Sequence, residues 1–333
     1  MLKRSYLFFL VLGLWLVLSS CLPRTPESSG IIETTSQVTP SLTLAREIIS
    51  TPTPTQQKGV GSSPSPGASW TSTRPAQVNA TSLPLIATEL AGIPTETPCI
   101  MKGGKIVSAS YQSRVLKLPL EYRVYIPPCY EVNQEDRYPV LYLMHGQSFT
   151  DDQWDRMGVD EKSNRLIASG QIPELLIVMP RDRYGGQPSE SQFGEVIVKE
   201  LMPLIDRTYR TKPERLYRAV GGLSRGAGWS VHLAVNYWML FSALGAHSPA
   251  IFYEDAHHMR DLLDAIPRSS LPRIFMDVGD KDRPEIMQAA FWFEGLLNER
   301  DIPHEYHMFS GYHDEIYWKD HLEQYLLWYA ADW

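Results

Sequence analysis

A single serine stands among glycines in the stretch GGLSRGAG, residues 221 to 228, and its hydroxyl is the first candidate for chemistry. With Gly222 and Gly226, Ser224 completes the pattern G-x-S-x-G, the sharp strand-to-helix turn that exposes a nucleophilic serine. The residues before the pattern read as a strand and those after it as a helix, as this turn requires. Two other interpretations are a glycine-rich phosphate cradle and a serine that caps a helix. The pattern predicts a nucleophile, provided that a base and an acid follow in order.

The base and the acid are expected from the two last strand ends of the chain. His313 follows the last predicted strand, in SGYHDEIYW, and an imidazole there could take the proton of the Ser224 hydroxyl. A carboxylate after the preceding strand would accept the other imidazole proton. The stretch MDVGDKDRPE offers Asp277, Asp280 and Asp282, of which the first lies inside the strand. The prediction is Asp282, with Asp280 as the alternative. Asp282 could also cap the helix that follows.

Charge on the oxygen of a tetrahedral intermediate needs preorganised N–H donors. The amide of Arg225 comes with the serine turn, and the amide of Gln147, in the loop after the strand at 138–146, is the predicted second donor. His145 is expected to order that loop rather than to take part in the chemistry. The histidines in the stretch 304–307 lack the H-E-x-x-H spacing of a zinc site. No metal and no cofactor are predicted.

These side chains come from distant segments, and the pattern from residue 99 onward predicts a scaffold that brings them together. Near-continuous apolar runs predict parallel strands covered on both faces at 138–146, 174–180, 216–222, 242–248, 273–279 and 305–311. Two apolar stripes of helical period predict crossover helices, one through Phe193, Ile197, Leu201, Leu204 and Thr208 and one through Ile286, Ala289, Phe293, Leu296 and Arg300. The alternation predicts a three-layer, doubly wound α/β sandwich with a mostly parallel sheet, in which ligands bind at the carboxyl ends of the strands.

An antiparallel hairpin is predicted at the start of this sheet. The segments 105–113 and 120–127 are rich in β-branched and aromatic residues, as strands are. Cys99 and Cys129 lie at nearly equal distances from the centre of the hairpin, so antiparallel pairing would bring them to the same end. In an exported protein, where disulfides persist, this arrangement predicts a Cys99 to Cys129 bridge.

The first 20 residues predict export. Lys3 and Arg4 precede an apolar run that is shorter than the roughly 20 residues needed to span a bilayer. The closing residues LSSC resemble the bacterial lipobox, whose cysteine becomes lipid-modified, so Cys21 is the predicted anchor at the outer face of a bacterial membrane. The alternative is an ordinary cleaved signal peptide with a cysteine near the cut.

Composition separates a tether from a folded domain. From residue 22 to residue 98, 36 of 77 residues are Ser, Thr or Pro and Trp70 is the single aromatic, so this stretch cannot bury enough apolar area to fold. The predicted organisation is a signal peptide at 1–20, a disordered tether at 21–98 and one domain at 99–333. The net charge of −7, without a basic stripe, argues against binding nucleic acid.

Five blocks in order resemble the putative esterase family of α/β hydrolases: YPVLYLMHG, ELMPLIDRTYRT, RAVGGLSRGAG, GDKD and SGYHDEIYW. The resemblance covers roughly residues 104 to 333. This family includes feruloyl esterases, esterase D-type enzymes, enterochelin esterases and mycolyltransferases. The resemblance implies an α/β-hydrolase fold and an ester substrate.

The matching positions imply roles for individual residues. Ser224 would be the nucleophile, Asp282 the acid and His313 the base, with the amides of Gln147 and Arg225 as the oxyanion hole. Arg225 departs from the pattern, because the family usually has methionine there. Its guanidinium could attract an anionic acyl group, which is a hypothesis about substrate choice.

The leading functional prediction is a serine carboxylic ester hydrolase that acts through an acyl-enzyme on extracellular carbohydrate or phenolic acid esters. One alternative is an acyltransferase of the same fold, and another is a surface lipoprotein that only binds a ligand. Four aromatic residues near the predicted strand tips could stack on sugars or phenolic acids, or could belong to the core: Trp154, Tyr184, Tyr317 and Trp318.

Overall fold

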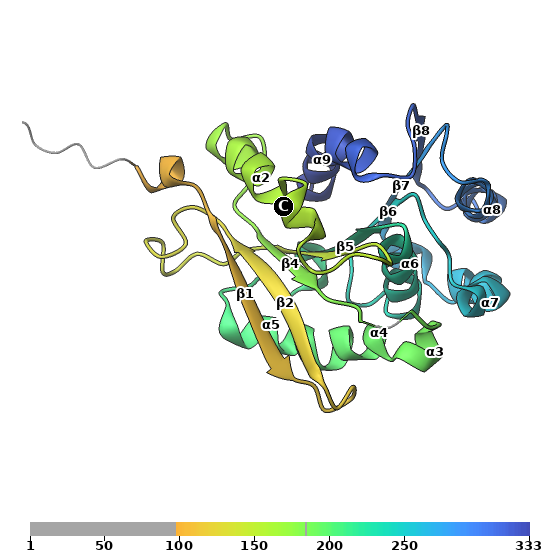
Figure 1. Cartoon of the computed structure of the whole chain (residues 1–333), viewed down its shortest axis with the longest axis horizontal. Helices are drawn as coiled ribbons and strands as arrows, with labels where there is room; N and C mark the ends of the chain where they lie inside the picture. Colours follow the sequence, from red (N-terminus) through yellow and green to blue (C-terminus); the bar gives the residue numbers. More distant parts are fainter. Residues whose placement is uncertain (1–97, 184) are drawn as a thin grey trace, which may run out of the picture. The chain divides into compact units, whose positions relative to one another are not determined.

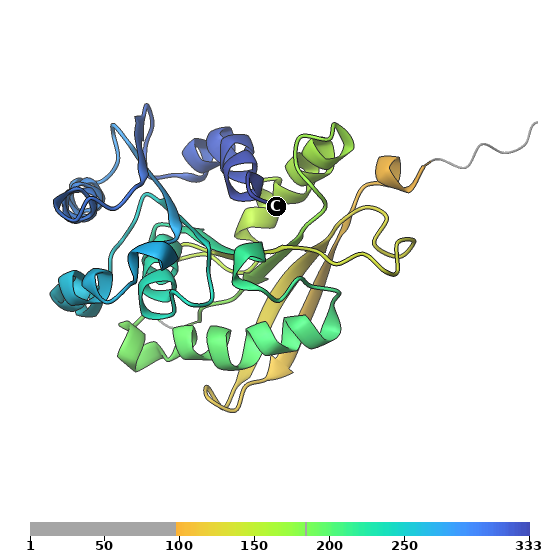
Figure 2. The ribbon, with the colours of Figure 1, turned by 180° about the vertical axis from the view of Figure 1, so that it is seen from behind.

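The computed structural model describes residues 98–183 and 185–333. The predicted signal peptide, the lipidated Cys21 and all but the last residue of the predicted tether lie outside these residues. The described part forms an eight-stranded sheet with helices on both faces (Figures 1 and 2). The predicted doubly wound α/β sandwich is therefore confirmed.

The sheet is parallel except at one edge. Its strand order is β1-β2-β4-β3-β5-β6-β7-β8, and only the β1–β2 and β2–β4 pairs are antiparallel. The central strands are buried along almost their whole length, as expected for apolar strands covered on both faces. The strands are β1 (Lys105–Gln112), β2 (Pro119–Ile126), β3 (Val140–Met144), β4 (Leu176–Pro180), β5 (Arg218–Leu223), β6 (Ala243–His247), β7 (Arg273–Gly279) and β8 (Glu305–Phe309).

The antiparallel edge is the hairpin β1–β2, in which Lys105 pairs with Ile126 and Gln112 with Pro119. This register brings Cys99, in a short 3-10 turn before β1, next to Cys129, just after β2. The two Sγ atoms are joined in a disulfide of 2.00 Å, with the Cα atoms 5.0 Å apart. The covalent bond fixes the start of the described domain to the end of its first hairpin.

Removing this disulfide is expected to destabilise the domain. The bridge closes a loop with a sequence separation of 30 residues, which in the chain-entropy view stabilises the fold by about 3.6 kcal/mol. Urea unfolding of the wild type and of a Cys99→Ser, Cys129→Ser double variant should show this difference in the free energy of unfolding. Equal unfolding free energies would contradict the expectation.

The helices divide into two layers, which Figures 1 and 2 show on opposite sides of the sheet. One layer is formed by α1 (Gln153–Arg156), α2 (Val159–Ala168) and α9 (Glu315–Ala330), whose apolar side chains share one core cluster. The other layer is formed by α4 (Phe193–Val196), α5 (Met202–Thr208), α6 (Arg225–Asn236), α7 (Tyr253–Asp264) and α8 (Pro284–Glu299), after the short helix α3 (Pro188–Ser191).

The first predicted apolar stripe holds as far as Leu204, which is partly buried against the core, and is wrong at Thr208. A π-helical segment, Ile197–Leu201, separates α4 from α5, so the side chains that follow it are turned relative to a continuous α-helix. Met202 and Ile205 are buried there, whereas the predicted Thr208 is exposed. Pro203 accounts for the change, because proline has no N–H to donate to the preceding turn and its ring clashes with the carbonyl four residues earlier.

A buried carboxylate fixes α9 to the sheet. Asp277 in β7 is fully buried and lies opposite His247 of β6 in the strand register. Its Oδ1 is 2.6 Å from His247 Nδ1, and its Oδ2 accepts hydrogen bonds from the hydroxyls of Tyr317 (2.6 Å) and Tyr325 (2.8 Å). Tyr329 adds a contact of 3.0 Å between its hydroxyl and His247 Nε2. The three hydrogen-bonding partners satisfy the polar atoms of this side chain, which burial would otherwise make costly.

Two glycines make room for this polar cluster. A Cβ atom built on Gly221 would lie 1.7 Å from the Tyr329 hydroxyl oxygen, and one built on Gly245 would lie 1.8 Å from it. Both distances are far inside van der Waals contact. The absence of side chains at these positions of β5 and β6 is therefore a packing requirement of α9, separate from the glycines of the serine turn.

Candidate active site

Ser224 lies at the carboxyl end of β5, where the chain turns into α6. Its φ of 54° and ψ of −121° fall outside the regions that ordinary residues favour. Backbone hydrogen bonds hold this conformation: the Ser224 N–H donates to the His247 carbonyl at 2.9 Å, and the Ala250 N–H donates to the Ser224 carbonyl at 3.1 Å. The predicted sharp turn is thus present, with the neighbouring strand fixing it.

The flanking glycines are required by close backbone contacts. A Cβ on Gly222 would lie 2.4 Å from the carbonyl of Gly226, and a Cβ on Gly226 would lie 2.2 Å from the Met144 oxygen. A Cβ on Gly228 would lie 2.2 Å from the Ala250 oxygen. Any side chain at these positions would push α6 away from the sheet and change the direction of the Ser224 hydroxyl.

The structure brings the predicted nucleophile, base and acid together. His313 Nε2 lies 2.9 Å from Ser224 Oγ, and His313 Nδ1 lies 2.7 Å from Asp282 Oδ1. A carboxylate can only accept, so Nδ1 donates its proton to Asp282 and leaves Nε2 available as the acceptor for the hydroxyl proton. This is the proton arrangement needed for a serine nucleophile activated by a histidine.

Asp282 remains ionised although its side chain is buried. Burial disfavours the charged form, but hydrogen bonds from His313 and Ser248, and the attraction to His313 when its imidazole is protonated, outweigh it, so the pKa of Asp282 is lowered. The Arg283 N–H also donates to Oδ1 at 2.6 Å. A carboxylate with a lowered pKa is suited to stabilise an imidazolium.

The contacts of Asp280 and Asp282 show which of the two pairs with His313 and whether Asp282 caps a helix. Asp280 accepts the N–H of Gly311 at 2.9 Å, so it holds the loop that leads to His313 without touching the imidazole. The N-cap residue of α8 is Arg283, and no side chain caps that helix. Asp282 therefore does not act as the helix cap that the sequence also allowed.

Two residues support the acid and the base in ways that the sequence did not indicate: Ser248 was not predicted, and Trp318 was considered only as an aromatic contact for substrate or as a core residue. Trp318 packs the edge of its ring against His313, with centroids 5.0 Å apart, and its Nε1 donates to Ser248 Oγ at 3.3 Å. Ser248 directly follows β6 and has a φ of 50°. Its place at the carboxyl end of a strand next to the serine strand was the signal that could have identified it.

The loop after β3 is held by side chains on both sides. The Gly146 N–H donates to Gln153 Oε1 at 2.8 Å, and the Asp182 N–H donates to His145 Nε2 at 2.9 Å. His145 must then carry its proton on Nδ1, which donates to the Gly146 carbonyl at 2.7 Å. Burial lowers the pKa of His145, which favours this neutral form. His145 thus orders the loop, and Gln147 of that loop lines the same cavity as Ser224.

The guanidinium of Arg225 is held inside the protein. Its Nε donates to Asp182 Oδ2 at 2.9 Å and its Nη2 to the Gly186 carbonyl at 2.8 Å, and both charged side chains are almost fully buried. The Trp229 indole N–H donates to the same carboxylate oxygen at 2.8 Å. This pairing argues against the hypothesis that the Arg225 side chain attracts an anionic acyl group. Its backbone amide opens α6, where the first N–H groups have no acceptor within the helix.

Ser224 and His313 open into a cavity of about 450 Å³. Phe149 and Ile316 are exposed apolar residues on its lining, and Ile316 is 71% exposed. Of the aromatic residues considered as sugar contacts, Trp154 and Tyr317 are buried in the core, where they cannot stack on a sugar. Trp318 is also buried, although it forms part of the cavity wall. Tyr184 lies outside the described residues.

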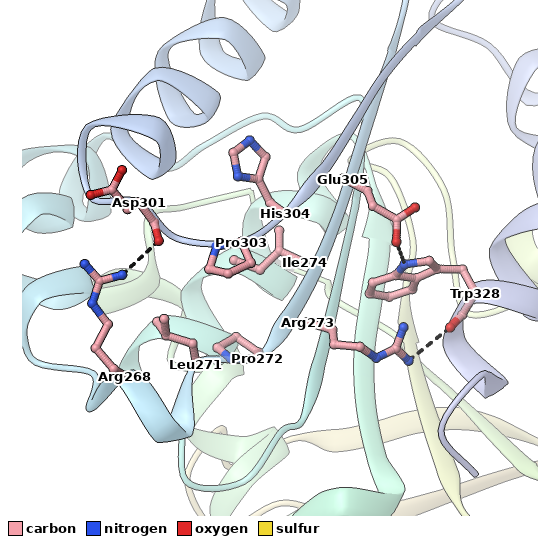
Figure 3. Close-up of a pocket in the computed structure, with 10 residues that line it drawn as sticks. All are labelled: Arg268, Leu271, Pro272, Arg273, Ile274, Asp301, Pro303, His304, Glu305 and Trp328. Carbon is pink, nitrogen blue, oxygen red and sulfur yellow. Dashed lines mark hydrogen bonds between the residues drawn. The ribbon is translucent and has the colours of Figure 1, made fainter.

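A larger cavity, of about 530 Å³, lies at the opposite end of the sheet, at the amino ends of β7 and β8 (Figure 3). Its polar side chains are occupied by other protein groups: Trp328 Nε1 donates to the Glu305 side chain at 2.7 Å, Arg273 donates to the Trp328 backbone carbonyl at 3.0 Å, and Arg268 donates to the Asp301 backbone carbonyl at 2.8 Å. No serine or cysteine lines it. The chemistry of the described residues therefore points to the smaller cavity.

The described residues contain neither a candidate membrane-spanning helix nor a candidate metal-binding cluster. None of the helices in this part of the chain is both long and apolar enough to span a membrane. Within the same residues, no group of three or more His, Cys, Asp or Glu side chains could hold a metal ion.

Comparison with other sequences identifies relatives for most of the described domain. Residues 113–329 match the model of a family described as Putative esterase. The chain is 31% identical over 202 residues to an endo-1,4-beta-xylanase/feruloyl esterase of Xylanibacter ruminicola. This alignment covers 53% of this chain and 26% of the relative. It is 32% identical over 129 residues to Esterase Rv1288 of Mycobacterium tuberculosis, with 35% of this chain and 27% of the relative covered. The chain spans about a quarter of the length of these two curated relatives.

Comparison with solved structures supports the same fold. A ferulic acid esterase superposes with a TM-score of 0.63 at 25% identity, covering 69% of this chain and 98% of the other. A feruloyl esterase module from Clostridium thermocellum, complexed with sinapinate, superposes with a TM-score of 0.58 at 18% identity, covering 70% of this chain and 89% of the other. At that identity the second likeness shows the fold alone.

Proposed function

This chain belongs to the Putative esterase family, as the five sequence blocks predicted, and on this premise we propose that it is a serine carboxylic ester hydrolase that forms an acyl-enzyme. One observation carries the proposal: the chain of contacts from Asp282 through His313 to Ser224 ends in a cavity open to an ester. A fold with this family likeness but without the contacts would suit a binding protein equally well.

The proposed reaction proceeds in two halves. Ser224 Oγ attacks the ester carbonyl carbon while His313 Nε2 takes the hydroxyl proton, and the carbonyl electrons move onto oxygen. When the tetrahedral intermediate collapses, the bond to the alcohol oxygen breaks and Nε2 returns its proton to that oxygen. Water then attacks the acyl-enzyme by the same steps and releases the acid and the free Ser224 hydroxyl. Asp282 stays ionised throughout and stabilises the imidazolium.

The amides of Gln147 and Arg225 are the proposed donors to the negative oxygen of the intermediate. The contacts that order the Gln147 loop support this assignment, because a preorganised donor needs no rearrangement during the reaction. Each such donor typically contributes about 3 kcal/mol to stabilising the transition state. His145 and Gln153 would act through this loop, as positioning residues that never touch the substrate.

The proposed substrates are acyl esters of carbohydrates or of phenolic acids outside the cell. The names of the relatives support this class, since they include feruloyl esterases. The apolar side chains of Phe149 and Ile316 on the cavity lining are compatible with an aromatic or aliphatic acyl group.

The test is to incubate the purified protein with p-nitrophenyl, acetyl-xylan and feruloyl esters and to measure the free acid released. A fluorophosphonate reagent should label the protein once, and mass spectrometry should locate the label on Ser224. Adding a sugar alcohol as acceptor separates hydrolysis from acyl transfer, because a transferase would form a new ester. No release of acid from any ester, with Ser224 unlabelled, would refute the proposal.

We further propose that the chain is exported and attached to a membrane by lipid on Cys21, with residues 22–98 as a tether. The sequence alone supports this, through the signal-like residues 1–20 and the motif LSSC. In bacteria that express the protein, an inhibitor of the lipoprotein signal peptidase should cause a precursor to accumulate. Processing that continues unchanged with the inhibitor would favour an ordinary signal peptide.

A further inference from the structure

Arg283 differs from the other charged residues on the lining of the active-site cavity. It immediately follows Asp282, is exposed, and lines the same cavity as Ser224 and His313. Its backbone N–H is bonded to Asp282. Its guanidinium has no hydrogen bond, ion pair or ring contact with any residue of the described chain. The positive charge is therefore available to a molecule that enters the cavity.

The acidic residues on the same lining already have partners. Glu315 accepts hydrogen bonds from Arg156, with Oε1 2.9 Å from Nη2, and from Gln153 at 3.1 Å. Asp314 is the N-cap of α9, where its side chain accepts the Tyr317 N–H at 3.0 Å. A carboxylate at a helix N-terminus is partly neutralised by the helix dipole. The cavity thus presents one cation that is uncompensated among the described residues.

We propose that Arg283 selects ester substrates that bear a negative charge, such as a carboxylate on the acyl or the alcohol part. This inference rests on the proposed ester hydrolysis and names a substrate class for it. The Arg225 side chain cannot serve this purpose because Asp182 already pairs with it inside the protein. Arg283 presents the same guanidinium chemistry on the open side of the nucleophile, where it can pair with a carboxylate in two hydrogen bonds.

The test compares matched esters that differ by one carboxylate. For the acyl side, p-nitrophenyl hemisuccinate is compared with p-nitrophenyl butyrate; for the alcohol side, feruloyl glucuronate is compared with feruloyl glucose. In Arg283→Gln the ratio of kcat/KM values, anionic over neutral, should fall about two- to fivefold in at least one pair, as expected for an exposed ion pair. The pair that responds identifies which part of the substrate faces Arg283.

Matched variants separate a local contact from a general change of charge. Arg283→Lys keeps a cation at the site and should retain most of the preference. Lys281→Gln removes an exposed cation two residues away that stacks on Tyr312 and does not line the cavity, so the ratio should stay at the wild-type value. About 0.5 M NaCl should reduce the preference of the wild type, because salt screens exposed charges.

The outcomes distinguish this inference from the proposed function beneath it. Equal ratios in the wild type and Arg283→Gln for both pairs would overturn the role of Arg283, while hydrolysis of the neutral esters would continue. If Ser224→Ala hydrolysed the neutral esters as fast as the wild type, the proposed function itself would fail. Since the Arg283 side chain is exposed and forms no hydrogen bond or ion pair with the described residues, its replacement should leave the fold intact.

Discussion

Alanine at position 224 is expected to lower kcat/KM for ester hydrolysis by about 10⁴- to 10⁶-fold. The loss is large because the hydroxyl that His313 Nε2 contacts at 2.9 Å is the proposed nucleophile. Ser148 is the other serine on the cavity lining, and His313 is hydrogen-bonded to Ser224 and Asp282 instead. His313→Ala should cause a loss of similar size. Steady-state rates on a p-nitrophenyl ester, with enzyme concentration set by absorbance, measure both.

The double variant tests whether the two residues act as one unit. Ser224→Ala with His313→Ala should be no slower than either single variant, because each change alone already disables the same step. His307→Ala is a matched control: this histidine lies in β8 and does not line the cavity. If the losses of the two single variants multiplied in the double variant, Ser224 and His313 would act independently. That result would contradict the proposal that they act as one unit.

The strands were predictable because each is a short apolar run bounded by polar residues. The predicted segments 138–146 and 273–279 contain β3 and β7, and the predicted hairpin coincides with β1 and β2 within one or two residues. Burial on both faces removes the period-2 alternation, so length and composition were sufficient for these elements. The helix through Leu204 was predicted less well, because one proline changed the turn geometry locally.

The chain order of the site residues was predictable, but their supporting contacts were not. Ser224, Asp282 and His313 each follow a strand in the order that the family likeness implies, which is information held in the sequence. The contacts of Ser248 and Trp318 depend on which strands are neighbours and on how α9 lies over the sheet. The pairing of Arg225 with Asp182 likewise joins segments 43 residues apart. No local pattern records such a partner.

The same limit applies to Asp277, which the sequence offered only as a rejected candidate for the acid. Its partner His247 lies on the adjacent strand, and three tyrosines reach the pair from α9, more than 30 residues further along the chain. Gly221 and Gly245 belong to this cluster although one of them adjoins the serine turn. A buried Asp and His in hydrogen-bond contact are thus no proof of a catalytic site. Access to a cavity distinguishes a catalytic Asp–His pair from a structural one.

Asp277→Ala is expected to lower the free energy of unfolding by about 3 to 5 kcal/mol. The side chain is 0% exposed, and its removal leaves His247 Nδ1 and the hydroxyls of Tyr317 and Tyr325 without their acceptor in the core. Each unsatisfied donor carries its own desolvation cost, which water cannot relieve at this depth. Urea unfolding followed by tryptophan fluorescence measures the difference.

A matched substitution shows whether burial is the cause. Asp264 has a polar partner too, since its carboxylate pairs with Arg300 at 2.8 Å, but its side chain is 61% exposed. Asp264→Ala should therefore cost less than about 1 kcal/mol, as exposed ion pairs do. Tyr325→Phe, which removes one donor and leaves the carboxylate with its other partners, should cost about 1 kcal/mol. If Asp277→Ala were as stable as Asp264→Ala, the buried cluster would not be what fixes α9 to the sheet, and the position of Trp318 beside His313 would need another support.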